Sequence, residues 1–220
     1  MLFLPGIIGV QIAAGTTAFT PGGLLPGRVD VGMGNALLLL LVFGAAKAAL
    51  MPLHGWLPGA MVAPAPVSAM LHAVAVVKAG VFVILKVSAY IFGPNLISAL
   101  PAATWLLWIA AGTIVIASVV AMTKDDLKAR LAWSTVGQLA YITSAAMLPA
   151  AAGLVAGGLH MLVHAFAKIT LFMCAGAIYV ATGASKVSEM RGLGRSMPIV
   201  FSCFMVGALC VVGLPPFAGM

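Results

Sequence analysis

Long apolar runs separated by short polar or turn-forming stretches are the main pattern of this sequence. A membrane-spanning helix needs about 20 mostly apolar residues, and runs of that order recur along the chain. We expect spans over residues 1–18, 34–51, 67–92, 102–122, 131–148, 154–181 and 198–214. Proline, glycine or charged residues fill the stretches between them and mark the helix ends. The pattern predicts an all-α, polytopic transmembrane helix bundle of about seven spans, forming a single membrane domain over residues 1–220.

The composition excludes soluble enzymes, disordered chains and nucleic-acid-binding modules. Of the 220 residues, 63% are apolar and 7% are charged, whereas soluble domains have roughly 45–50% and 25%. So few polar side chains cannot cover a water-facing surface, although the formal net charge is +7. The cysteines Cys174, Cys203 and Cys210 lie in apolar runs without a Cys-x-x-Cys pair, so we interpret them as packing residues.

The basic residues indicate how the chain is oriented in the membrane. One side of the predicted bundle carries six of them in its loops: Lys124, Lys128, Arg130, Lys186, Arg191 and Arg195. The other side carries Arg28 alone. Because cytoplasmic loops are enriched in lysine and arginine, we expect the loops over 124–130 and 183–197 to face the cytoplasm.

Two proline clusters interrupt the apolar pattern. Pro52, Pro64 and Pro66 break one stretch, and Pro215 and Pro216 break another near the end of the chain. Non-helical backbone at membrane depth is tolerated only against protein or a water-filled cavity, so the clusters predict broken helices that line a pathway. Surface loops are the alternative for the 52–66 stretch.

Basic side chains also occur inside the predicted spans. Lys47, Lys78 and Lys168 lie there with His72, His160 and His164. A charge at the bilayer centre costs about 2.5–3.5 kcal/mol on insertion scales, so such residues usually face a wet interior and serve function. Lys86 lies close to the end of its span and can instead extend its ammonium group to the interface.

His160, His164 and Lys168 follow one another at intervals of four residues. On a helix this spacing places all three side chains on one stripe. Imidazole titrates near neutral pH, so a row of such groups joined by water can pass a proton stepwise. Structural polar packing is one alternative. A metal site is another, but no carboxylate or cysteine ligand stands nearby and Lys168 would repel a cation.

The remaining charged positions are harder to interpret. His72 and Lys86 are fourteen residues apart and share a helical face, whereas Lys78 points elsewhere and is an accessory candidate. The acidic residues Asp30, Asp125, Asp126 and Glu189 all lie in predicted loops. We therefore expect a buried Lys47 to take its anionic partner from a segment or subunit outside this chain.

Four segments together resemble the antiporter-like membrane subunits of respiratory complex I, the Mrp-type cation/proton antiporters and the membrane-bound hydrogenases. They are residues 47–72, residues 126–138, His160 to Lys168 with Phe172, and residues 213–219. The resemblance implies that Lys47, His72, Lys128, His160, His164 and Lys168 form a proton relay. Lys78, within Val-Val-Lys-Ala-Gly, looks more like the Mrp and hydrogenase branch.

The resemblance also implies a function and a location. We expect a proton-translocating or cation/proton-exchanging subunit in the inner membrane of a bacterial or archaeal cell, with other membrane subunits, protons and Na⁺ as its partners. The chain looks like the central portion of the family's subunit, because the upstream helices and the terminal charged residue of that subunit have no counterpart here. A non-conducting scaffold and a stand-alone solute transporter are the competing hypotheses.

Redox chemistry is expected on partner subunits. The sequence has no nucleotide fingerprint, flavin site or iron–sulfur cysteine pattern, so we expect no cofactor in this chain. Whether the complete assembly is an enzyme of the NADH:quinone oxidoreductase type or an antiporter stays open at this point.

Overall fold

The computed structural model describes residues 2–214, and this part of the chain is helical with no β-strand. Its α-helices are α1 (Phe3–Ala14), α2 (Val31–Gly44), α3 (Trp56–Gly59), α4 (Ala65–Ala73), α5 (Val76–Lys86), α6 (Gly93–Ala99), α7 (Pro101–Thr123), α8 (Leu127–Met147), α9 (Ala151–Thr182), α10 (Leu193–Ser196) and α11 (Pro198–Val212). Short 3₁₀ turns form η1 (Ala46–Ala48), η2 (Ala60–Val62) and η4 (Val187–Met190), and η3 (Val87–Phe92) is a π-helix. The all-α prediction is confirmed.

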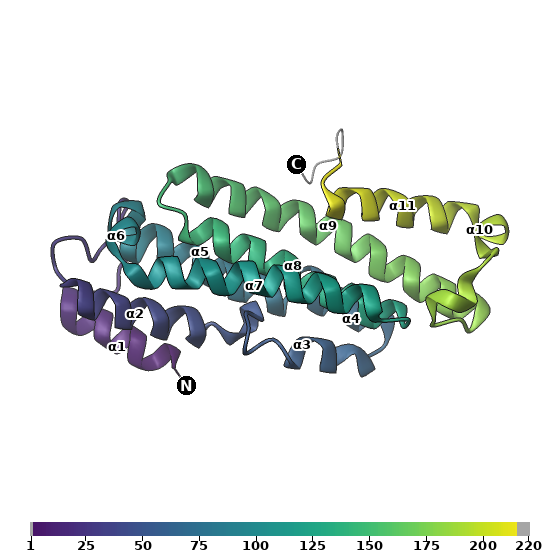
Figure 1. The fold of residues 1–220 in the computed structure, drawn as a ribbon, viewed down its shortest axis with the longest axis horizontal. Helices are drawn as coiled ribbons and strands as arrows, with labels where there is room; N and C mark the ends of the chain where they lie inside the picture. The colour runs from purple at the N-terminus through teal and green to yellow at the C-terminus, as the bar shows by residue number, and fades with distance from the viewer. Residues whose placement is uncertain (1, 215–220) are drawn as a thin grey trace.

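The long helices run along the long axis of an elongated bundle (Figure 1). α1 and α2 cover one half of its length, and α3 lies along the other half. α7, α8 and α9 pack together through small residues: buried alanines line α7, and a Cβ atom at Gly157 of α9 would come within 3.3 Å of Ala145 on α8. Small residues let membrane helices approach closely, so this packing suits a lipid environment.

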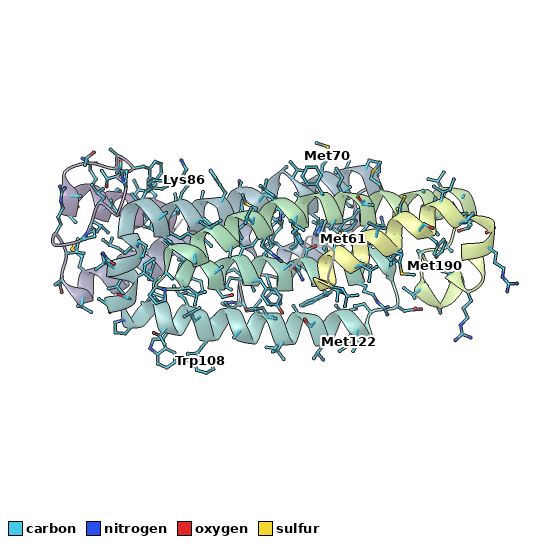
Figure 2. All side chains as sticks on the ribbon, turned by 90° about the horizontal axis from the view of Figure 1, so that it is seen from above. Met61, Met70, Lys86, Trp108, Met122 and Met190 are labelled. Atoms are coloured by element: carbon cyan, nitrogen blue, oxygen red, sulfur yellow. The ribbon has the colours of Figure 1, made fainter. Side chains whose placement is uncertain are left out.

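Three helical segments are long and apolar enough to cross a membrane: Ala65–Ala99, Pro101–Thr123 and Ala151–Thr182. The last two match the spans expected over 102–122 and 154–181. The helices α1, α2 and α11 are apolar but have only 12, 14 and 15 residues. They end before the expected runs do, because left-handed Gly15 and Gly213 close α1 and α11, and the chain leaves α2 for the short turn η1. The outward face of α7 is apolar, with Trp105 and Trp108 69% and 71% exposed, as lipid contact requires (Figure 2).

The predicted break between α2 and α4 is present. α2 ends at Gly44, and Ala49 has a φ of 54°, a left-handed conformation that no α-helix interior contains. A chain of short turns then leads to Pro64, which immediately precedes the first residue of α4. Lys47 therefore lies within the break, in η1, three residues after α2 ends. The prolines Pro215 and Pro216 of the second predicted break lie outside the described residues.

A second interruption divides the span expected over 67–92. α4 ends at Ala73 and Val74 leaves helical geometry, while the Ala75 amide donates to the Met70 carbonyl five residues back at 2.9 Å before α5 begins at Val76. No proline or glycine stands at this point, so the sequence carries no ordinary breaker signal there. The interruption changes the rotational phase of α5 relative to α4.

The two basic loops form a clasp at one end of the bundle, defined here as residues 124–130 and 183–190. Asp126 caps the start of α8 by accepting a hydrogen bond from the Ala129 amide at 2.8 Å, and it forms an isolated β-bridge with Lys186. Asp125 accepts hydrogen bonds from the hydroxyl and the amide of Ser188 at 2.7 and 3.1 Å. These bonds hold the pKa of Asp125 below its ordinary value of 3.8.

Candidate functional site

Basic side chains from α5 and α9 meet in the interior of the bundle. Lys168, His164 and Lys78 are 0%, 2% and 7% exposed, so each is shielded from the surface by this chain itself. The expected stripe on α9 is present: His160, His164 and Lys168 follow at one-turn intervals, and the His160 and His164 rings stack with centroids 6.3 Å apart. We refer to Lys78, His160, His164 and Lys168 as the basic cluster.

Lys78 and His164 are in direct contact. The Lys78 Nζ atom lies 2.6 Å from Nδ1 of His164, a hydrogen-bond distance. Two protonated groups cannot make this contact, because one nitrogen must supply a lone pair to the other's proton. At least one of the two groups is therefore unprotonated when the contact forms, and the hydrogen bond joins two basic nitrogens directly.

The prediction that His72 and Lys86 share a helical face, with Lys78 pointing elsewhere, is wrong, because His72 and Lys78 both contact α9. A helical projection from His72 assumes an uninterrupted helix, but the interruption at Val74 and Ala75 rotates α5 and turns Lys78 toward α9. For the same reason His72 and Lys86 do not share surroundings. The His72 ring packs against Phe172 of α9, with centroids 4.9 Å apart, whereas the Lys86 ammonium group lies over the ring of Phe19.

Lys168 is held by groups of α8. Its Nζ atom donates to the carbonyl oxygen of Leu131 at 3.0 Å and to the hydroxyl of Ser134. The Leu131 carbonyl oxygen also accepts hydrogen bonds from the hydroxyl groups of Ser134 and Thr135. Buried charges need such hydrogen bonds where no carboxylate pairs with them.

His160 continues the cluster toward α11. Its Nε2 atom lies 2.7 Å from the Oε1 atom of Gln138, and the Gln138 amide nitrogen donates to the carbonyl of Val211 at 3.3 Å. Val211 is in the last turn of α11, next to the point where the second helix break is expected. The contacts thus run from Lys78 through His164 and His160 to the end of α11.

His72 lies close to this region without joining the hydrogen bonds. It is fully buried at the end of α4, and neither ring nitrogen has a hydrogen-bond partner within residues 2–214. Both nitrogens therefore have unused donor or acceptor capacity beside α9.

Lys47 and Lys128 are not part of the cluster. Lys47 is exposed on the surface of the described residues, so the polar interior expected around it would have to be completed by a segment outside them. Its exposure follows from the early end of α2, after which η1 lies across α5 at Gly80. Lys128 opens α8 as expected, and its Nζ atom donates to the Ala63 carbonyl at 3.2 Å.

Ser134 and Gln138 are functional candidates that sequence reasoning missed. Both lie on α8, four residues apart, and they present hydrogen-bonding groups to Lys168 and His160, which are themselves eight residues apart on α9. The sequence carried a signal for them: polar side chains inside an apolar helix need partners, and α8 has a polar stripe that can face the one on α9.

Comparisons with known proteins agree with this architecture. The model of the family "NADH:quinone oxidoreductase/Mrp antiporter, TM" matches residues 1–220. NAD(P)H-quinone oxidoreductase chain 5 of Synechocystis is 36% identical over 233 residues, covering 98% of this chain and 33% of that protein. NADH-quinone oxidoreductase subunit L of Mycobacterium tuberculosis is 37% identical over 185 residues, covering 83% and 28%.

A solved structure, that of the Mrp complex from Dietzia sp. DQ12-45-1b, contains a chain that superimposes with a TM-score of 0.88 at 32% identity. The match covers 99% of the present chain and 24% of the other. The chain therefore spans about a third or less of the length of these relatives. With a family match over its whole length, the chain belongs to the NADH:quinone oxidoreductase/Mrp antiporter transmembrane family.

Proposed function

We propose that this chain is part of a proton-translocating membrane subunit, in either a complex I-like NADH:quinone oxidoreductase or an Mrp-type monovalent cation/proton antiporter. The observation that carries the proposal is the buried contact between Lys78 and His164, one helical turn from Lys168. Relatives named as quinone oxidoreductase and Mrp complex subunits support the same assignment.

Electrostatic coupling gives this cluster a mechanism. No carboxylate of residues 2–214 pairs with the cluster, since Asp30, Asp125, Asp126 and Glu189 cap helices or bond within loops. A proton added to one basic group therefore raises the free energy of protonating its neighbours. A proton that arrives at Lys78 favours departure from the His160 end, without a large backbone movement.

The proposal extends to location and partners. It places the chain in the inner membrane of a bacterium or archaeon, beside other membrane subunits, with any redox chemistry on those partners. Protons are the proposed cargo, and Na⁺ exchange is the antiporter variant of the same proposal. Lys47, His72 and Lys128 are retained as relay members that would connect through segments beyond those described.

Proton pumping in sealed vesicles tests the proposal. In the complete complex, Lys168→Ala should abolish most translocation while assembly is retained, because alanine fits α9 and removes only the ammonium group. Lys124→Ala, an exposed loop lysine, is the matched control and should pump at the wild-type rate. Equal pumping by Lys168→Ala and wild type at matched protein levels would refute the relay and favour the non-conducting scaffold.

A further inference from the structure

A second feature of the molecule lies away from the basic cluster, near the other end of α5. A cleft of about 440 Å³ opens between α1, α2, α5 and η3, and none of the cluster residues lines it. Its walls are almost entirely apolar and include Phe3, Ile7, Leu41, Val83 and Ile91. A cleft of this size and character fits a hydrocarbon chain.

One cation borders the cleft. The Lys86 ammonium group lies 4.7 Å from the ring centroid of Phe19, and 5.6 and 5.7 Å from those of Phe82 and Tyr90. The aromatic faces stabilise the positive charge but accept no ordinary hydrogen bond from it. Within residues 2–214 no carboxylate or carbonyl oxygen accepts from Lys86, so its donors are available to an anion.

The surroundings of the cleft indicate where that anion comes from. Leu4, Ile8 and Ile12 expose 64%, 51% and 76% of their area along α1, so the surface beside the cleft is apolar and suited to contact with lipid. The loop after α1 returns to this place, where Leu24 and Leu25 donate to the Ile91 carbonyl at 2.9 Å. The same loop carries Arg28, whose guanidinium group donates to the last residue of α1.

We propose that this cleft binds an anionic phospholipid, with an acyl chain between α1 and α5 and the phosphate group on Lys86. Lys86 lies at the edge of the molecule away from Trp108, on the side that α7 does not cover (Figure 2). A phospholipid meets both requirements of the site at once, since hydrocarbon fills the apolar walls and the phosphate accepts from the ammonium group. An apolar helix of another subunit would fill the cleft but leave the cation without an acceptor.

Lipid retention by the purified protein tests this proposal. The protein, with any subunits that remain bound, is placed in nanodiscs made of equal parts of phosphatidylglycerol and phosphatidylcholine, and the lipids retained after extraction are quantified by native mass spectrometry. We expect wild type to retain phosphatidylglycerol preferentially. Lys86→Met should lower that preference about tenfold, the effect of one charge-assisted hydrogen bond.

Two further variants keep the result interpretable. Lys86→Arg preserves the positive charge and should retain the preference, which shows that loss in Lys86→Met is not misfolding. Lys124→Met removes a lysine from an exposed loop and should leave retention unchanged. Equal phosphatidylglycerol retention by wild type and Lys86→Met, or wild type that retains no lipid because a subunit fills the cleft, would overturn the proposal. Proton pumping is not measured in this experiment, so its result does not depend on whether the proposed relay is correct.

Discussion

Individual side chains in this protein gain their roles from contacts across α8 and α9. Gln138 shows this most clearly, because it joins His160 on one side to the backbone of α11 on the other. A glutamine held at both ends fixes the orientation of the imidazole ring, and ring orientation decides which nitrogen carries the proton.

Replacement of Gln138 therefore has a specific expected effect. Gln138→Leu keeps the side-chain volume but removes the acceptor, so proton translocation should fall by roughly tenfold, the value of about one hydrogen bond. The rate of acidification in sealed vesicles measures this. Ser144→Ala is the matched control, since within the described part of the chain the Ser144 hydroxyl donates only to carbonyls of its own helix. The positioning role is contradicted if both variants translocate alike.

At the scale of elements, the position of η1 depends on one glycine of α5. A Cβ atom on Gly80 would come within 2.3 Å of the Ala48 amide nitrogen and 2.5 Å of the Lys47 carbonyl carbon. Because both neighbours are backbone atoms, a side chain here must move η1 away from α5.

We expect Gly80→Ala to destabilise the protein by about 2 kcal/mol, within the range known for overpacked cores. Gly112→Ala is the comparison, since no atom of residues 2–214 lies within 4 Å of a Cβ atom at that position of α7. It should be neutral or stabilise by up to about 1 kcal/mol, because alanine favours the helix. Thermal unfolding in detergent measures both, and equal melting temperatures would contradict the close packing of η1.

The clasp between the basic loops is a second element-scale feature. Asp125→Ala removes both acceptors used by Ser188, so trypsin should cleave after Lys186 faster than in wild type. Asp30→Ala, at the start of α2, serves as the control. Cleavage at the wild-type rate in Asp125→Ala would show that the clasp does not depend on this carboxylate.

The clasp also has an expected pH dependence. The folded pKa of Asp125 is lowered, so its stabilising effect is fully present above the ordinary value of 3.8 and is lost as the pH falls through the lower, folded value. Protection of Lys186 from an acid-active protease should therefore persist at pH 5 and weaken only in stronger acid. Loss of protection between pH 7 and pH 5 would contradict the claim that the Asp125 carboxylate protects Lys186.

Sequence periodicity predicted some elements better than others, for physical reasons. α7 and α9 were placed to within a few residues because long, uninterrupted apolar runs have one stable form in lipid. α2 was placed too long, because its apolar run continues through the left-handed Ala49. The interruption at Val74 and Ala75 has no breaker residue, so tertiary packing sets it, and the orientation of Lys78 could not be read from the sequence.

For the whole molecule, the uneven distribution of basic residues predicts orientation. The clasp carries most of the loop lysines and arginines, whereas the loop between α1 and α2 carries Arg28 alone. In inside-out vesicles, trypsin should cleave after Lys186 without detergent, since the cytoplasmic side then faces the medium. Cleavage that requires detergent in those vesicles, but not in right-side-out ones, would reverse the topology.

The central claim is that protons pass through the Lys78–His164 contact, and a double-mutant comparison of pumping rates tests it most directly. Lys78→Met and His164→Phe, alone and combined, are compared in sealed vesicles at matched protein levels. If both residues serve one path, each single variant loses most of the rate and the double variant is no slower than the slower single one. Losses that multiply in the double variant, or a wild-type rate in Lys78→Met, would contradict the relay.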